Sequence, residues 1–482
     1  MANEKIKSNF IYNALFQLSG IIIPLITLPY LTRVLHADGM GKYAFSYSVA
    51  YYFYIFIRLG LHNYGNRTIA YVKDDQHELS KTFFEIYAFQ FFMGCSMSVI
   101  YLMYCIFLSS DKTLSFIFLL VVMAGGIDLT WALYGLEEFK VTSIRDISVK
   151  VLTAACIFAF VKDESDVWKY SLIYCNGFFI SQVVSIPILK KRISYVKPKY
   201  QDIIVHIKPN LILFLPTIAV SVYKTMDKIM LGLMASEQEL GYYHSCENII
   251  KVPLALITAL GTVMLPRMSN ILSHGNDNSE AETIFDKSIA FVMFISSSVC
   301  IGIMTVSKEF VPLFFGEGFD KCVTLFNIIL PSCLFLAFAN VIRTQFLLPR
   351  KKDRLFIISL FTGAAVNLIL NLILIPGFAS VGAAIGTLAA EIVVCVVQAV
   401  SVYKEAHIGR NIINSLPFVL AGVLMYAVFS NYSPVILGND ILSLLFKIVI
   451  CGLFYLAVLG VLWFGKIKIH YQGNNSVKKE KI

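Results

Sequence analysis

Apolar residues are gathered in long runs along this chain, and short polar stretches separate the runs. Most runs are close to the roughly 20 residues that a helix needs to cross a bilayer. The pattern therefore predicts an all-α polytopic membrane protein with about fourteen transmembrane helices. The predicted spans are 10–32, 43–62, 83–108, 114–136, 146–161, 168–189, 210–234, 245–265, 285–306, 322–344, 355–376, 380–402, 413–430 and 441–464.

The composition supports the same fold class. Of the 482 residues, 57% are hydrophobic and only 15% are charged, against roughly 25% charged residues in an ordinary soluble domain. This excludes a soluble globular enzyme and a disordered chain. The ten cysteines lie mostly in apolar runs and show no CxxC or Cys/His spacing. We therefore expect small core side chains, with no disulfide framework, metal site or cofactor.

Basic residues predict how the spans are oriented. The N-terminal tail, every second connection with the adjoining span ends, and the C-terminal tail together hold 29 of the 40 Lys and Arg residues, and the remaining connections with their adjoining span ends hold 8. Cytoplasmic loops are enriched in Lys and Arg, so both termini are predicted to be cytoplasmic. The clusters at 190–192 and 350–354 are expected to anchor this topology, with contact to anionic lipid headgroups. A specific ligand site is the alternative for these clusters.

The second half of the chain weakly repeats the first. Residues 31–43 and 229–243 each contain an apolar helix end, a short polar stretch, and then Gly and Tyr opening the next span. The preceding helices are interrupted by Pro24 and Pro29 in the first half and by Pro216 in the second. Repeats with broken helices at corresponding places are typical of transporters. A simple structural kink is the alternative reading of each proline.

Several short motifs carry a family resemblance through their order and spacing. They are Leu28-Pro29-x-x-x-x-Arg33, Gly39-x-Gly41-x-Tyr43, Leu59-Gly60, Asn66-Arg67, Asp227-Lys-Ile-Met-Leu-Gly232, Gly241-Tyr-Tyr243, Asn367-x-x-x-Asn371-x-x-x-x-Pro376 and Gly382-Ala-Ala-Ile-Gly-Thr-Leu-Ala-Ala-Glu391. With these motifs the chain resembles the polysaccharide flippases, the Wzx-type translocases of O-antigen and capsule repeat units. Their superfamily also holds multidrug-and-toxin antiporters and lipid II flippases.

The resemblance implies an architecture and an activity. Residues 1–200 and 201–405 would form two six-helix lobes around a central cavity, and 406–482 would add two helices and a basic cytoplasmic tail. The protein would move an undecaprenyl-diphosphate-linked oligosaccharide across the bacterial cytoplasmic membrane by alternating access, for O-antigen (lipopolysaccharide) or capsule synthesis. Its implied partners are membrane lipid, this substrate and polysaccharide polymerase machinery, with no nucleic acid.

Basic residues within the spans are the first candidates for a substrate site. A charge at the centre of a membrane helix costs roughly 2.5–3.5 kcal/mol, so it should face a cavity or a partner. Lys224 and Lys228 are four residues apart and share one helix face. Together with a third cation they would suit a diphosphate. The candidate diphosphate and cavity residues are Arg33, Arg58, Lys224 and Lys228. For Arg58, snorkelling to the membrane interface is the alternative.

Three carboxylates inside spans are candidates for energy coupling or for structural pairing. They are Asp227, Glu391 and Asp128. The chain shows no nucleotide-binding motif, so the energy would come from an ion gradient, the membrane potential or substrate supply. H⁺ and Na⁺ are the candidate coupling ions. The structural alternatives are pairing of Asp227 with Lys224 and pairing of Glu391 within its own lobe.

Tyrosines form a stripe on the second predicted span. Tyr43, Tyr47, Tyr51 and Tyr54 recur every three or four residues, and Arg58 continues the series. Sugars stack on aromatic faces and bond to hydroxyl groups, so Tyr47, Tyr51 and Tyr54 are candidate sugar contacts. An aromatic belt at the membrane interface combined with packing is the alternative.

Two other function classes compete with the flippase. A cation-coupled drug or small-molecule antiporter of the same superfamily would need an acidic site, whereas the candidate cavity is basic. A membrane enzyme such as a polymerase is disfavoured because catalytic motifs are absent and the predicted outer connections are short. The near miss to a phosphate-binding loop at 460–466 lacks the Ser or Thr that should follow it and is assigned to chance.

Overall fold

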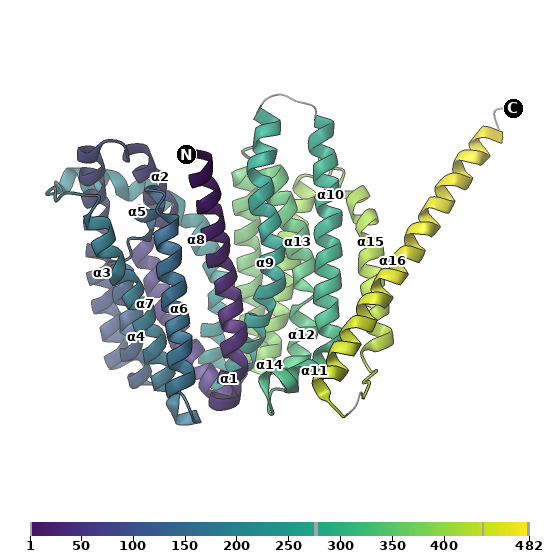
Figure 1. Ribbon diagram of the computed structural model, residues 1–482, viewed down its shortest axis with the longest axis horizontal. Coiled ribbons are helices and arrows are strands. Elements are labelled where there is room, and N and C mark those ends of the chain that lie inside the picture. Colours follow the sequence, from purple (N-terminus) through teal and green to yellow (C-terminus); the bar gives the residue numbers. More distant parts are fainter. Residues whose placement is uncertain (1, 274–277, 436–437, 480–482) are drawn as a thin grey trace. The chain divides into compact units, whose positions relative to one another are not determined.

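The computed structural model describes residues 2–273, 278–435 and 438–479, and this described part is helical without a strand (Figure 1). Within it, side chains are described for 11–221, 225–272, 279–435 and 438–463. The chain divides into two compact units. Unit 1 is Met1–Asn248 with Ile375–Ser380, and unit 2 is Ile249–Leu374 with Val381–Ile482.

Unit 1 contains eight helices and the start of a ninth. They are α1 (Ala2–Arg58), α2 (Leu61–Val72), α3 (Gln76–Phe107), α4 (Lys112–Gly126), α5 (Thr130–Gly135), α6 (Phe139–Phe160), α7 (Val167–Lys190), α8 (Tyr200–Met234) and the first turns of α9 (Glu237–Ser273). A single 3₁₀ turn, Glu164–Asp166, precedes α7. Helix α1 packs against α3, α4, α6, α7 and α8.

Unit 2 contains the rest of α9 and the C-terminal helices. They are α10 (Asn278–Ser296), α11 (Gly302–Phe315), α12 (Lys321–Ile329), α13 (Ser332–Val341), α14 (Asp353–Ser401), α15 (Ile408–Phe429) and α16 (Asp440–Lys479). Two π-helical stretches, Ser297–Ile301 and Ile342–Leu347, follow α10 and α13. Helix α15 packs against α10, α11 and α16.

The predicted all-α membrane architecture is confirmed, but the predicted count of fourteen spans is not. Eleven segments of the described chain are helical, long and apolar enough to cross a membrane. Two of them are broken inside. Helix α1 has non-helical backbone at His36, and α14 has it at Ala379. At 33–42, where the sequence predicted a loop, the helix instead continues on both sides of a single break.

Close helix contacts in unit 1 use small residues. A Cβ added at Gly94 of α3 would lie 2.6 Å from the Cα of Gly126 in α4, so the two backbones touch. Small residues allow this approach in membranes, where helix association depends on packing. Beside this contact, the Gln90 amide donates to the carbonyls of Gly125 and Asp128, at 2.8 and 2.9 Å. Gln90 thereby fixes the end of α4 and the chain that follows it.

The connection before α3 is closed by a helix cap. The Asp75 carboxylate accepts hydrogen bonds from the backbone N–H groups of Glu78 and His77, at 3.1 and 2.9 Å. These bonds stabilise the ionised form and lower the pKa of Asp75 below its ordinary value. The cap therefore stabilises the folded chain above the ordinary pKa of an aspartate, and the effect is lost as the pH falls through the lowered pKa.

Polar contacts inside unit 2 join its helices. Lys447 of α16 is fully buried and donates to both carboxylate oxygens of Glu309 in α11, at 2.7 and 2.9 Å. On α14, a Cβ at Gly386 would overlap the side-chain oxygen of Asn371. The Asn and Gly of the predicted motifs therefore meet where the two parts of α14 pack together.

Candidate functional site

The tyrosine row of α1 is one continuous stack. We define the tyrosine row as Tyr43, Tyr47, Tyr51 and Tyr54. Successive ring centroids lie 6.0, 5.5 and 5.9 Å apart, with interplanar angles of 9°, 20° and 21°. Spacings of four, four and three residues place the rings on one helix face. Tyr43 and Tyr54 at the ends are buried, whereas Tyr47 and Tyr51 in the middle are partly exposed.

Two tyrosines of α7 extend the aromatic surface. The Tyr170 ring lies 4.4 Å from that of Tyr43, and the Tyr174 ring lies 5.8 Å from that of Tyr47 at a near-perpendicular angle. Tyr170 and Tyr174 are themselves four residues apart and therefore share a face of α7. The two helices together build a wall of edge-on and stacked rings with hydroxyl groups along it.

An ion pair ends the row at Tyr54. Arg58 Nε lies 3.1 Å from Asp128 Oδ2. The Tyr54 hydroxyl donates to the same carboxylate oxygen at 2.6 Å and accepts from Arg58 at 2.9 Å. Asp128 is 1% exposed, while the Arg58 side chain keeps 20% of its surface open. The arginine is therefore both held in place and reachable.

The connection after α4 positions this ion pair. The second Asp128 oxygen, Oδ1, accepts from the backbone N–H of Thr130 at 2.9 Å. Trp131 is fully buried and donates from its indole to Gln90 at 2.8 Å. The carboxylate is thus oriented by backbone and side chains that leave it little freedom to rotate.

A second ionic group lies beyond the other end of the row. Lys228 of α8 pairs with Glu247 of α9 at 2.8 Å, and the nearby His244 Nδ1 lies 3.9 Å from the same carboxylate oxygen. Asp227 is buried and accepts a hydrogen bond from Tyr243 at 2.8 Å. The predicted residues Asp227 and Lys228 therefore have partners on α9.

The tyrosine row approaches this second group directly. The ring of Tyr43 lies 6.0 Å from that of His244. The row consequently spans the distance between an arginine–aspartate pair and a lysine–glutamate pair, all within unit 1. Such an arrangement offers aromatic faces and hydroxyls in the middle, with cations beyond each end.

Glycines bring the two repeated segments into contact with each other. A Cβ at Gly41 would overlap the backbone carbonyl of Glu237, and a Cβ at Gly241 would overlap that of Ala37. The two contacts are reciprocal, because each glycine faces the residue four positions before the other. Lys42 adds an ion contact to Glu237 at 3.6 Å. The Gly-Tyr motifs of the two halves therefore meet in one crossing.

Arg33 and Glu391 lie apart from this group, and the side chain of Lys224 is outside the described residues. Arg33 is exposed on α1 before the break at His36, and it donates to the carbonyl of Pro29 at 2.7 Å. Glu391 is buried in α14 within unit 2. The side chain of Lys224 lies outside the described residues, so its pairing with Asp227 stays a prediction.

Sequence reasoning missed Glu247, Tyr170 and Tyr174. Glu247 lies just inside the predicted span 245–265, so the rule that selected the other intramembrane charges could have found it. The two tyrosines show the same spacing of four that revealed the tyrosine row. Their proximity to that row depends on the packing of α7 against α1, which no local pattern carries.

Two solved structures share the fold of this chain. The chain is similar to the lipid II flippase MurJ in an inward closed conformation, with a TM-score of 0.73 and 14% identity over 95% of this chain and 99% of that one. It is also similar to a multidrug resistance MATE transporter of the MOP superfamily in an inward-facing conformation. That TM-score is 0.56, with 12% identity over 87% of this chain and 100% of the other. Both likenesses show a shared multi-helix fold.

The sequence comparisons name the family. The family described as "Polysaccharide biosynthesis protein" matches residues 6–272, more than half of the chain. The chain is 22% identical over 401 residues to the "Putative O-antigen transporter" of Escherichia coli (strain K12), covering 81% of this chain and 94% of the relative. The protein belongs to the polysaccharide biosynthesis protein family, and the predicted resemblance to the Wzx-type flippases is confirmed.

Proposed function

We propose that this protein is a flippase that moves an undecaprenyl-diphosphate-linked oligosaccharide across the bacterial cytoplasmic membrane for surface polysaccharide synthesis. The observation that carries the proposal is the tyrosine row ending at Arg58. Stacked, partly exposed rings suit the faces of sugars, and their hydroxyls suit sugar hydroxyls. A partly open guanidinium at the end of the row suits a phosphate through paired N–H donors.

The ion pair sets how the diphosphate would bind. Asp128 keeps Arg58 charged and oriented before substrate arrives, which avoids an unpaired charge in the membrane. The remaining N–H groups of the guanidinium can then donate hydrogen bonds to a phosphate oxygen without breaking the ion pair. The substrate would thus add to an existing network, with the diphosphate at Arg58 and the sugars along Tyr51 and Tyr47.

Alternating access is the proposed transport cycle. Two six-helix lobes, 1–200 and 201–405, would open the central cavity to one side and then to the other, while 406–482 would supply two additional helices and a basic cytoplasmic tail. The crossing at Gly41 and Gly241 is a close contact between the two repeated segments, one from each proposed lobe. Pro29 and Pro216 lie in the helices that lead to the crossing and provide places where those helices can bend.

Coupling to H⁺ or Na⁺ belongs to the same proposal. Asp227 and Glu391 are the carboxylates proposed to sense the gradient. An inside-negative potential assists the export of an anionic substrate by about 2.3 kcal/mol per charge at 100 mV. Asp227→Asn should therefore change the response of transport to an imposed pH or sodium gradient if Asp227 binds the coupling ion. An unchanged response to every gradient would make its bond from Tyr243 purely structural.

The paired carboxylates disfavour the drug antiporter. Asp128 is paired with Arg58, and Glu247 is paired with Lys228. A cationic drug would need a carboxylate that is not already neutralised by a protein cation. These two carboxylates are therefore already neutralised and do not offer a site for a cationic drug.

The function is tested by complementation in a strain that lacks its own polysaccharide flippase. The intact gene should restore surface polymer, and a Tyr47→Ala, Tyr51→Ala double variant should not, at equal protein levels. Restoration by the double variant would remove the tyrosine row from the transport pathway. Drug resistance without restoration of polymer would favour the antiporter.

The proposed topology has its own test. Both termini are proposed to be cytoplasmic, so single cysteines at Ser194 and Ser236 in a cysteine-less protein should react from opposite sides of the membrane. Labelling of both positions from the same side would overturn the orientation.

A further inference from the structure

One face of the first half of α8 contacts α2 and α3, which belong to the same unit. His206 Nδ1 lies 2.5 Å from the Tyr64 hydroxyl, and its Nε2 lies 3.1 Å from Glu85 Oε2. Glu85 is buried and the His206 side chain is 12% exposed. This network joins α8 to α2 and α3.

The same face continues for two further turns. Asn210 follows His206 by four residues, and a Cβ at Gly60 would overlap its backbone carbonyl, so the two backbones are in contact. Phe214 follows after four more residues and packs in a buried cluster with Ile55 and Leu59. The spacing of four places all three α8 residues on one helix face.

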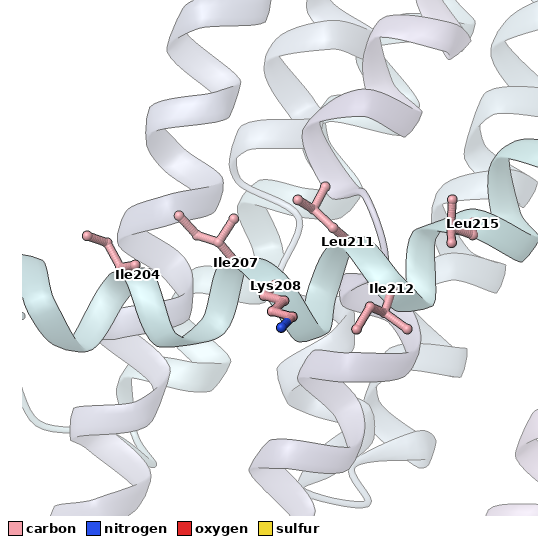
Figure 2. Close-up of a pocket in the computed structure, with 6 residues that line it drawn as sticks. All are labelled: Ile204, Ile207, Lys208, Leu211, Ile212 and Leu215. Atoms are coloured by element: carbon pink, nitrogen blue, oxygen red, sulfur yellow. The ribbon is translucent and has the colours of Figure 1, made fainter.

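The outward side of this half-helix carries a pocket. It is an open hollow with a volume of about 410 Å³. Figure 2 shows that all of the lining side chains project from α8. They are Ile204, Ile207, Lys208, Leu211, Ile212 and Leu215. The lining thus consists of five aliphatic side chains and one cation.

Lys208 is the feature that makes this more than a lipid-facing surface. It is exposed, and it forms no ion pair or hydrogen bond among the residues whose side chains are described. A lysine on an apolar helix face must reach the polar interface or meet an anion, because its charge is costly in hydrocarbon. The other lining residues are aliphatic and need no charged partner.

The preceding connection adds positive charge of the same kind. Residues 190–208 contain six Lys and Arg residues. All six are exposed, and five of them precede α8: Lys190, Lys191, Arg192, Lys197 and Lys199. Clusters of four to eight basic residues beside a membrane helix bind anionic lipid headgroups. A ligand that satisfies both features has an apolar chain and an anionic head.

We propose that this pocket is a binding site for an anionic phospholipid, with the phosphate at Lys208 and an acyl chain along Ile204, Leu211 and Leu215. The site is separate from the tyrosine row, so the proposal does not depend on the substrate assigned above. Because the opposite face is fixed through His206, Asn210 and Phe214, a lipid bound here holds the first half of α8 against unit 1. Anionic lipid thereby stabilises the arrangement of α8 seen in this structure.

Lipid binding to the purified full-length protein tests the site. Phosphatidylglycerol, phosphatidylcholine and an isoprenyl phosphate are titrated separately into detergent micelles, and bound lipid is counted by native mass spectrometry. The intact protein should bind phosphatidylglycerol in preference to phosphatidylcholine. Lys208→Gln should weaken phosphatidylglycerol binding about fivefold, as expected for one basic residue at an anionic surface, while Lys208→Arg should retain it.

Lys404→Gln is the matched control, because Lys404 is exposed on a predicted cytoplasmic connection and does not line this pocket. The control should bind phosphatidylglycerol as the intact protein does. Leu211→Ala should weaken phosphatidylglycerol binding through the acyl chain. Equal binding by Lys208→Gln and the intact protein would overturn the proposal, as would an equal loss in the Lys404 control. Displacement of phosphatidylglycerol from this site by the isoprenyl phosphate at lower concentration would reassign it to the substrate.

Discussion

The second half of α1 and the first turns of α9 are built alike but carry different chemistry. Each has, close to its start, a glycine that contacts the other segment, Gly41 or Gly241, and each presents a tyrosine two residues later. Four residues beyond that tyrosine, α1 has Tyr47 and α9 has Glu247. The first segment continues as stacked rings, and the second joins an ion pair with α8.

The comparison separates residues that set the backbone crossing from those that set its chemistry. At the crossing, carbonyl groups occupy the space that a Cβ would need, so both segments require glycine there. Away from the crossing, side chains face different neighbours and were free to diverge. The shared motif therefore belongs to the fold, and the positions that differ include those at which we propose substrate binding.

The largest expected effect comes from filling the crossing. Gly41→Val and Gly241→Val should each destabilise the protein by about 3 kcal/mol, because overpacking against a backbone cannot be relieved by a rotamer change. Both should also abolish surface polymer. Thermal unfolding of the purified variants measures the first effect. Gly452→Val is the control, since nothing lies within 4 Å of a Cβ there. Destabilisation by only one of the two crossing variants would contradict the reciprocal contact.

Breaking the arginine–aspartate pair should have the next largest effect. Arg58→Leu or Asp128→Leu alone should cost about 2–3 kcal/mol, because each leaves a charge without its ionic partner, while Arg58 is partly exposed and Asp128 keeps its bonds from Tyr54 and Thr130. The Arg58→Leu, Asp128→Leu double variant should recover most of that stability and still fail to transport. Denaturation and complementation are measured on the same set of variants. Transport by the stable double variant would show that Arg58 has no role in binding substrate.

Changes within the tyrosine row should act on transport more than on folding. Tyr51→Ala should lower the transport rate about tenfold, since losing one stacking contact costs about 1.4 kcal/mol. Tyr51→Phe keeps the ring and should lose less. Initial rates in proteoliposomes distinguish the two variants. Equal loss in both would assign the role to the hydroxyl instead of the ring face.

The smallest expected effect is at the ion pair of the second segment. Glu247→Gln leaves Lys228 without its carboxylate, and Lys228→Met with Glu247→Met removes both charges. The double variant should be more stable than Glu247→Gln and should keep more than half of the transport activity. If it instead loses transport as completely as the Arg58 variants, the second segment also contacts the substrate.

Local patterns in the sequence predicted much of the helix architecture but not its contacts. Apolar runs gave the membrane helices, and the three- and four-residue spacing gave the tyrosine row. The break in α1 is a single residue, His36, where polar residues suggested a loop. The polar stretch around His36 has the composition of a loop, although it is helical on both sides of that residue. Hydropathy therefore could not distinguish a loop from a broken helix here.

The candidate site was only partly predictable for a related reason. Arg58 and Asp128 were both selected because charges are costly in a membrane, yet their pairing joins residues 70 positions apart. The Gly-Tyr repeat likewise marked Gly41 and Gly241, but their mutual contact joins segments 200 positions apart. These pairings depend on how α1 packs against its neighbours in the folded chain. No local pattern in the sequence predicts that packing.

Photo-crosslinking from the tyrosine row directly tests whether this row binds the substrate. A photoreactive amino acid is placed at Tyr51, or at Phe92 as a control whose side chain is 69% exposed on α3, in membranes that hold radiolabelled lipid-linked oligosaccharide. We expect labelled substrate to become attached at position 51, and excess unlabelled substrate to reduce this labelling. No specific attachment is expected at position 92. Transport-competent protein that never acquires label at position 51, or acquires it equally at both positions, would contradict the claim that the tyrosine row binds the substrate.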